Sequence, residues 1–351
     1  MFDHSGRFLV KVAAPLLKRT IDDVGDGPGQ PLSSLNGSGV AYTVSNVYPL
    51  LAIVEDENAP PGYRPLSLED PVPGADADAD AEAPRAADVP ITSSLRRTHA
   101  LLQSTGGWRA SFRGIVPFFV YGLLYSIIGH PLAIALGPIL SPFAIIIAAL
   151  VTVQFSTVWV HVVLTPSSSV SWWRRLPPFA STFRAVALPT VITMLASVAS
   201  VYIPALIGLA AGLPFFSPDR KPEIPSDTKT AVITVVVILS TLALQLVLTL
   251  PTLAILFRIQ ASLLSPDEDT IIPFDRSFGG RLEPAVVGGK PFASVRDAWA
   301  SLSRPALRRI IIVFAKVYGV NFVFWLALGA FVVPQLLLGS HFSKAASGSV
   351  I

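Results

Sequence analysis

A few polar side chains interrupt long apolar runs of this sequence, and they are the residues best suited to chemistry. Each would cost free energy in the hydrocarbon of a bilayer unless it faced protein or water. Residues 154, 157 and 161 share one face of a helix because of their three- and four-residue spacing. Such a set either hydrogen-bonds between helices or lines a cavity for a solute. The candidate intramembrane polar site consists of Gln154, Thr157, His161, Gln245, Lys316 and Asn321.

No pattern typical of an enzyme accompanies these residues. The sequence lacks a Ser/His/Asp set, a glycine-rich phosphate loop and histidines at metal-ligand spacing, and it contains no cysteine. We therefore expect no catalytic residue, no cofactor, no metal site and no enzymatic activity. The formal net charge of +3 is too small to predict binding to nucleic acid.

The elements that position the polar residues are long apolar runs. The hydrophobic fraction is 52%, only 14% of the residues are charged, and the mean hydropathy is +0.59. A soluble core cannot hide so much apolar surface, so the surplus must face lipid. A helix of ~20 residues crosses the ~30 Å hydrocarbon layer. Runs of that length lie at about 115–136, 143–164, 185–213, 231–257 and 310–338.

These runs predict an all-α integral membrane protein, a bundle of five to six transmembrane helices, five of them within residues 91–351. The short turn that contains Gly137 and Ser141 carries no charge, so the runs on either side of it must be antiparallel neighbours. A sixth span at 38–54 would be short, because its apolar run is broken by Ser45, Asn46 and Pro49 and falls below ~20 residues.

Two further segments precede the bundle. Residues 1–37 begin with a basic amphipathic pattern, which is typical of a membrane-surface helix or of a weak transit signal. Residues 55–90 are rich in proline and in acidic side chains, including the run ADADADAE. Such a composition cannot bury enough apolar surface to offset the loss of chain entropy. We expect 55–90 to be a disordered linker, which could also contact partner proteins.

The arginines indicate which hydrophilic segments share a side of the membrane. They gather before the run at 115–136, between 143–164 and 185–213, and between 231–257 and 310–338. The positive-inside tendency places these segments on one face. Trp172 and Trp173, beside two arginines, are typical of the aromatic belt at that face.

Proline or glutamine recurs near the end of alternate apolar runs at intervals of about a hundred residues, which indicates an internal repeat. Pro49, Gln154 and Pro251 occupy comparable positions, and a hydrophilic segment and then an arginine follow each of them. The period predicts three helical hairpins.

The third repeat contains Pro251, Arg258 and Gln260, and the second contains Gln154 and His161 at matching positions. This arrangement resembles the mitochondrial carrier family. Its odd helices end in a proline followed by one acidic and two basic residues, often with a glutamine two residues later. The resemblance makes these side chains remnants of the carrier motif: Pro251, Arg258, Gln260, Gln154 and His161.

The chain departs from the family where the charged pairs should stand. Leu253 and Leu256 replace them in the third repeat, and Ser156 and Trp159 replace them in the second. In the family these charges form a ring of ion pairs that closes a central cavity. Outer-membrane relatives of the carriers have lost the same charges and act in membrane dynamics, lipid handling and protein insertion.

The resemblance therefore implies a transport-inactive scaffold or adaptor in a mitochondrial membrane, the outer rather than the inner one. Its partners would be the lipid bilayer and proteins held by the acidic linker and the hydrophilic loops. No nucleic acid is expected. A small-molecule substrate is not favoured, because a carrier needs several charges in its cavity and only Lys316 qualifies. The alternatives are a divergent solute carrier and an unrelated polytopic protein of the secretory pathway.

Overall fold

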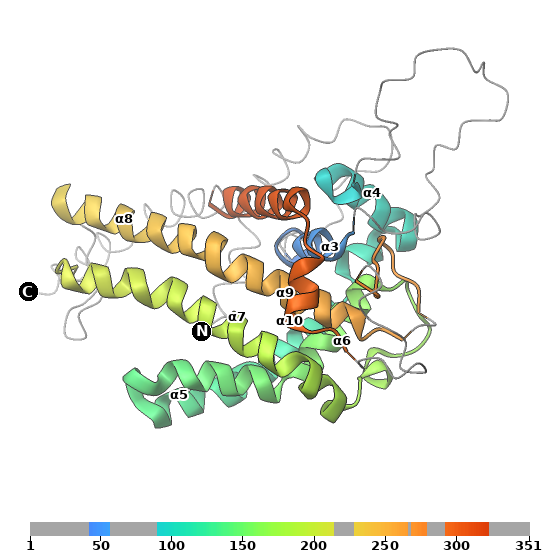
Figure 1. Ribbon diagram of the computed structural model, residues 1–351, viewed down its shortest axis with the longest axis horizontal. Helices are drawn as coiled ribbons and strands as arrows, with labels where there is room; N and C mark the ends of the chain where they lie inside the picture. Colours follow the sequence, from blue (N-terminus) through green and yellow to red (C-terminus); the bar gives the residue numbers. More distant parts are fainter. Residues whose placement is uncertain (1–41, 57–89, 214–227, 266–267, 279–291, 323–351) are drawn as a thin grey trace, which may run out of the picture. The chain divides into compact units, whose positions relative to one another are not determined.

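A computed structural model describes residues 42–56, 90–213, 228–265, 268–278 and 292–322 of the protein. Every regular element within these ranges is a helix (Figure 1). The predicted all-α class is thus confirmed for this part of the chain. The N-terminal segment 1–37, most of the linker at 55–90 and the second half of the run at 310–338 lie outside the described residues.

The described residues divide between two compact units. The first unit contains residues 42–52, 91–112 and 312–322. The second unit contains residues 53–56, Pro90 and the described residues from 113 to 311. Helix α3 (Tyr48–Val54) and the helix at 304–322 contribute residues to both units.

Helix α5 (Ile115–Val151), in the second unit, is a tight hairpin. Its backbone leaves the helical conformation at Gly137, where φ is 74° and ψ is 176°, a region that residues with a Cβ rarely adopt. A Cβ added to Gly129 would lie 3.4 Å from the Cβ of Ala148. In a straight helix these two residues would be about 28 Å apart. The chain therefore folds back after Gly137, in agreement with the predicted antiparallel neighbours.

The second apolar run is not one straight helix. The second arm of α5, Leu140–Val151, and α6 (Val153–Leu164) meet at an angle of 57°. Thr152 lies at the break, and its hydroxyl donates a hydrogen bond to the carbonyl of Ala148 at 2.6 Å. A threonine that bonds backward in this way competes with the regular ladder and bends a helix. The single span predicted at 143–164 is therefore broken at Thr152.

The next helices form a long packed pair. Helix α7 (Phe179–Ala210) runs beside α8 (Thr228–Leu244), η9 (Gln245–Thr249) and α9 (Leu250–Ser262), and it also packs against α5 (Figure 1). The π-helical turn η9 ends two residues before Pro251, whose ring in a regular helix would clash with the carbonyl four residues earlier. The hydroxyl of Thr193 crosses the interface and donates to the carbonyl of Thr252 at 3.0 Å.

Three described helical stretches are long and apolar enough to cross a membrane, and the bent pair would add a fourth. The three are Leu95–Gly137, Phe179–Ala210 and Thr228–Ser262. They agree with the runs predicted at 115–136, 185–213 and 231–257. The run at 38–54 contains only a short apolar helix, Thr43–Val54. These helices are compatible with an integral, multi-pass membrane protein.

The first unit joins the short N-terminal helix to an arginine-bearing segment. Its described elements are η2 (Thr43–Val47), part of α3, η5 (Ile91–Ser93), α4 (Leu95–Gly106) and η6 (Gly107–Phe112). The Tyr48 hydroxyl lies 3.1 Å from Nδ1 of His99. Ala52 packs with Val313 and Val317 of the helix at 304–322.

The ends of α6 and α9 lead into loops that are bonded together, and this pairing makes a prediction about topology. The amide of Ile271 donates to the carbonyl of Leu164 at 2.8 Å. Cysteines introduced at Ser168 and Ser277 should therefore react with an impermeant thiol reagent from the same side of the membrane. A cysteine at Ser217, which lies outside the described residues, should react from the other side. Labelling of Ser168 and Ser277 from opposite sides would contradict the paired hairpins.

Candidate functional site

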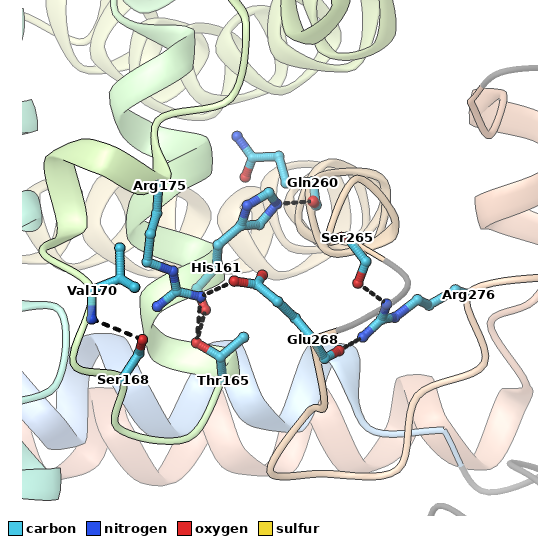
Figure 2. A network of polar contacts seen from close by, with 9 residues as sticks. All are labelled: His161, Thr165, Ser168, Val170, Arg175, Gln260, Ser265, Glu268 and Arg276. Carbon is cyan, nitrogen blue, oxygen red and sulfur yellow. Dashed lines mark hydrogen bonds and ion pairs between the residues drawn. The ribbon is translucent and has the colours of Figure 1, made fainter.

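A polar network joins α6 to α9 in the second unit. Nε2 of His161 lies 2.8 Å from the carbonyl oxygen of Gln260, and since a carbonyl only accepts, Nε2 carries the proton (Figure 2). The side-chain amide of Gln260 donates to the hydroxyls of Ser156 at 2.9 Å and Thr157 at 3.2 Å. His161, Thr157 and Gln260 are all buried. Two apolar helices are thereby fastened by three hydrogen bonds.

The helical spacing explains which predicted residues meet. Thr157 and His161 lie one turn apart on the face of α6 that contacts α9. Gln154 does not join them, because its amide donates instead to the carbonyl of Pro177, just before α7. Thr157 and His161 therefore share a partner on α9, whereas Gln154 contacts a different segment.

The other predicted site residues lie elsewhere. Gln245 belongs to η9 and lies about 22 Å along the helical stretch from Gln260. Lys316 and Asn321 belong to the first unit. Lys316 is exposed, and the Asn321 amide lies 3.5 Å from the Ser45 hydroxyl. The structure therefore brings together only part of the site expected from the sequence.

Arg258, two residues before Gln260, forms a buried ion pair. Its side chain is 1% exposed, and its Nη2 lies 3.1 Å from Oδ2 of Asp56. Its Nη1 also donates to the carbonyl of Ile53 at 3.4 Å. The guanidinium lies 5.5 Å from the ring centre of Phe274 and 6.0 Å from that of Phe278. Such aromatic faces favour a desolvated cation.

A second arginine holds the neighbouring acidic residue. Nη2 of Arg309 donates to the carbonyl of Glu55 at 2.9 Å, and its Nη1 lies 3.7 Å from a carboxylate oxygen of the same residue. The amide of Asp56 donates to the carbonyl of Pro273 at 2.8 Å. Two arginines and one backbone bond therefore fix the dipeptide that follows α3. The predicted disordered linker at 55–90 cannot include Glu55 and Asp56.

A third ion pair lies at the C-terminal end of α6. Nη2 of Arg175, in η7 (Trp172–Arg175), donates to Oε1 of Glu268 and to the hydroxyl of Thr165, at 2.9 and 2.8 Å (Figure 2). Arg276 donates to the carbonyls of Ser265 and Glu268. The loops after α6 and α9 are therefore held by charged groups close to His161.

The sequence analysis did not predict that Glu55, Asp56, Arg175 and Glu268 form ion pairs. A signal existed for the first pair: Arg258 stands inside an apolar helix, and a buried cation needs an anion. The nearest acidic residues that directly adjoin another apolar helix are Glu55 and Asp56. Their place at the start of an acidic, proline-rich segment concealed this role.

The network can fasten helices, and it leaves one acceptor open. Oε1 of Gln260 has no hydrogen-bond partner among the described residues, although the residue is only 1% exposed. In the ranges that the structure describes, no group of three or more His, Asp or Glu side chains is placed to hold a metal ion.

The five residues that resemble the carrier motif occupy different surroundings. Pro251 is the second residue of α9, and Gln154 bonds to the loop before α7. Arg258 and Gln260 are buried in the two networks, and His161 bonds to Gln260. Comparisons of this chain with protein-family models, with curated proteins and with solved structures found no match.

Proposed function

We propose that this chain is a multi-pass membrane protein that serves as a transport-inactive scaffold or adaptor and has no enzymatic role. The observation that carries the proposal is the pairing of two buried arginines: Arg258 is bound to Asp56 and Arg309 to Glu55. Charges that are satisfied inside the protein are not free to attract a solute. They instead fix where the acidic segment leaves the helices.

The aromatic contacts of α6 support the same proposal. Trp159 occupies a position where a carrier would hold a charge, and its ring packs against Phe118 of α5 and Phe257 of α9. Packed rings hold three helices together without a charge pair that a substrate could open. A rigid bundle of this kind suits the presentation of hydrophilic segments to partner proteins.

The proposed membrane is mitochondrial, and the outer one rather than the inner one. This part of the proposal rests on the resemblance of Pro251, Arg258 and Gln260 to the carrier motif and on the missing charges at Leu253 and Leu256. Roles in membrane dynamics, lipid handling or protein insertion follow from the same resemblance.

Two measurements test the proposal. A fluorescently tagged full chain should co-localise with an outer-membrane marker, and its tag should be cut by protease added to intact mitochondria. Vesicles that contain the purified chain should exchange labelled nucleotides, carboxylates, amino acids and phosphate no faster than empty vesicles. Location in the secretory pathway, or exchange above the empty-vesicle rate, would overturn the corresponding half of the proposal.

Lys316 provides a further prediction. An ammonium group buried in a span costs on the order of 2.5–3.5 kcal/mol, but Lys316 is exposed and lies about two turns from Arg308 and Arg309, so its side chain can extend to the polar boundary. Lys316→Met should change the free energy of unfolding in detergent by less than about 0.5 kcal/mol. Arg309→Met, which removes the partner of Glu55, should be clearly destabilising. Solute exchange that is lost in Lys316→Met would contradict the scaffold.

One observation favours a divergent solute carrier as the second candidate. The open acceptor of Gln260 points to a small donor that the described protein does not supply. If a solute supplies it, Gln260→Leu should abolish exchange in vesicles while the helix content of the protein stays unchanged. In the scaffold there is no exchange to lose.

A further inference from the structure

Exposed tryptophans accompany exposed arginines in each described segment that leads into an apolar helix. Trp108 is 58% exposed and the Cζ of Arg109 lies 5.6 Å from its ring centre. Trp173 is 58% exposed beside Arg174, and Trp299 of α10 (Val295–Ala300) is 50% exposed, one turn from Arg296. Indole rings prefer the boundary between hydrocarbon and headgroups.

The most complete of these surfaces lies at the start of α7, in the second unit. It consists of Trp173, Arg174, Phe179, Phe183 and Arg184, all of which are exposed. We call these five residues the Trp–Arg surface. Phe179 and Phe183 lie one turn apart, with their ring centres 5.6 Å apart, so they form one apolar strip between the two arginines in the sequence.

The two arginines of this surface differ from the arginine between them. Arg175 is bound to Glu268 and Thr165. Arg174 and Arg184 have no side-chain partner among the described residues. Their guanidinium groups are thus available to an anion from outside the protein, and the pairing of Arg175 keeps the backbone beside Arg174 in place.

An exposed apolar face follows Arg184 along α7. Leu188 and Leu195, four and eleven residues after Arg184 and therefore on the same face of the helix, are 63% and 51% exposed. A soluble acidic partner would leave this apolar face uncovered, whereas a lipid has acyl chains for it and a headgroup for the arginines. The charged arginines and the apolar residues would therefore both be satisfied by one amphipathic molecule.

We infer that the Trp–Arg surface binds an anionic phospholipid of the bilayer leaflet on the arginine-bearing side. Arg174 and Arg184 donate hydrogen bonds to the phosphate and to the extra negative charge of the headgroup, because a guanidinium matches the geometry of phosphate oxygens. Trp173, Phe179 and Phe183 lie at the level where headgroups meet acyl chains. A zwitterionic headgroup offers the same phosphate but no net charge, so it binds more weakly.

This inference rests on the proposed membrane location, and its test does not depend on whether the chain transports anything. The full chain in detergent micelles is mixed with equal amounts of phosphatidylserine and phosphatidylcholine, and native mass spectrometry measures which lipid stays bound. The wild type should retain phosphatidylserine in preference. Each arginine near an anionic lipid contributes about fivefold in binding, so Arg174→Gln and Arg184→Gln should each lower the preference about fivefold.

Lys229 provides the matched control. It is an exposed cation in the first turn of α8, and it has no exposed tryptophan or phenylalanine beside it in the sequence. Lys229→Gln removes the same charge and should leave the lipid preference unchanged, while circular dichroism should show equal helix content in all variants. A preference that survives Arg174→Gln/Arg184→Gln, or one that falls equally in Lys229→Gln, would overturn the inference. The first result would exclude these arginines, and the second would show a response to net charge alone.

Discussion

Replacing Asp56 with alanine is expected to lower the free energy of unfolding by about 3–5 kcal/mol, because it leaves Arg258 charged and without its anion inside the protein. Arg258 is 1% exposed and Asp56 is 13% exposed, so water cannot replace the lost carboxylate at the arginine. The carbonyl of Ile53 and the rings of Phe274 and Phe278 remain, but they do not carry a full charge. Denaturant titration of the purified chain in micelles measures the difference.

A double substitution separates the ion pair from the packing around it. Asp56→Ala/Arg258→Met removes both charges and should be less destabilised than Asp56→Ala alone, since no unpaired cation is left. Asp269→Ala is the control, because Asp269 is exposed and should change the stability by less than about 0.5 kcal/mol. If Asp56→Ala behaves like Asp269→Ala, the pair does not hold the dipeptide after α3.

The sequence predicted long helices well, because their apolar runs are longer than any alternative structure needs. The runs at 185–213 and 231–257 correspond to α7 and to the stretch from α8 to α9. The pattern could not show the bend at Thr152, since a hydroxyl that bonds to its own helix looks the same in sequence as one that faces solvent. The predicted repeats depend in part on residues outside the described ranges.

The candidate site was predicted in part because helical spacing is local and pairing is not. Thr157 and His161 could be placed on one face from their spacing alone. Their partner Gln260 lies about a hundred residues away, and the sequence gives no distance between the two helices. Asp56 was harder to predict. The composition of the segment that follows it assigned Asp56 to a disordered linker, but its ion pair with the buried Arg258 holds it in place.

The pairing of Asp56 and Glu55 also changes what the acidic segment can do. A linker that left the helices freely would reach any partner nearby. Because Arg258 and Arg309 hold its first two residues, the segment starts from a fixed point of the second unit. Asp56→Ala should therefore weaken the association of any partner that binds the linker and the hydrophilic loops together, since it loosens their spacing.

The second large loss of stability is expected on replacing Trp159. Its side chain is 5% exposed, and its ring centre lies 5.4 Å from that of Phe118 and 5.8 Å from that of Phe257. Trp159→Ala would open a cavity where α5, α6 and α9 meet. Truncation of a buried aromatic costs about 3–5 kcal/mol in soluble proteins. We expect the lower end of that range, because lipid tails are as apolar as the protein interior and the loss is one of packing.

Two further variants show what Trp159 contributes. Trp159→Phe keeps a ring between Phe118 and Phe257 and should recover most of the stability, whereas Trp299→Ala, at an exposed position, should cost less than about 0.5 kcal/mol. A divergent carrier would need this contact to open and close, so Trp159→Phe would alter its exchange rate. A scaffold needs only that the contact stays closed. Stability that tracks ring size, with no exchange in any variant, is the result expected of three helices held together permanently by packing.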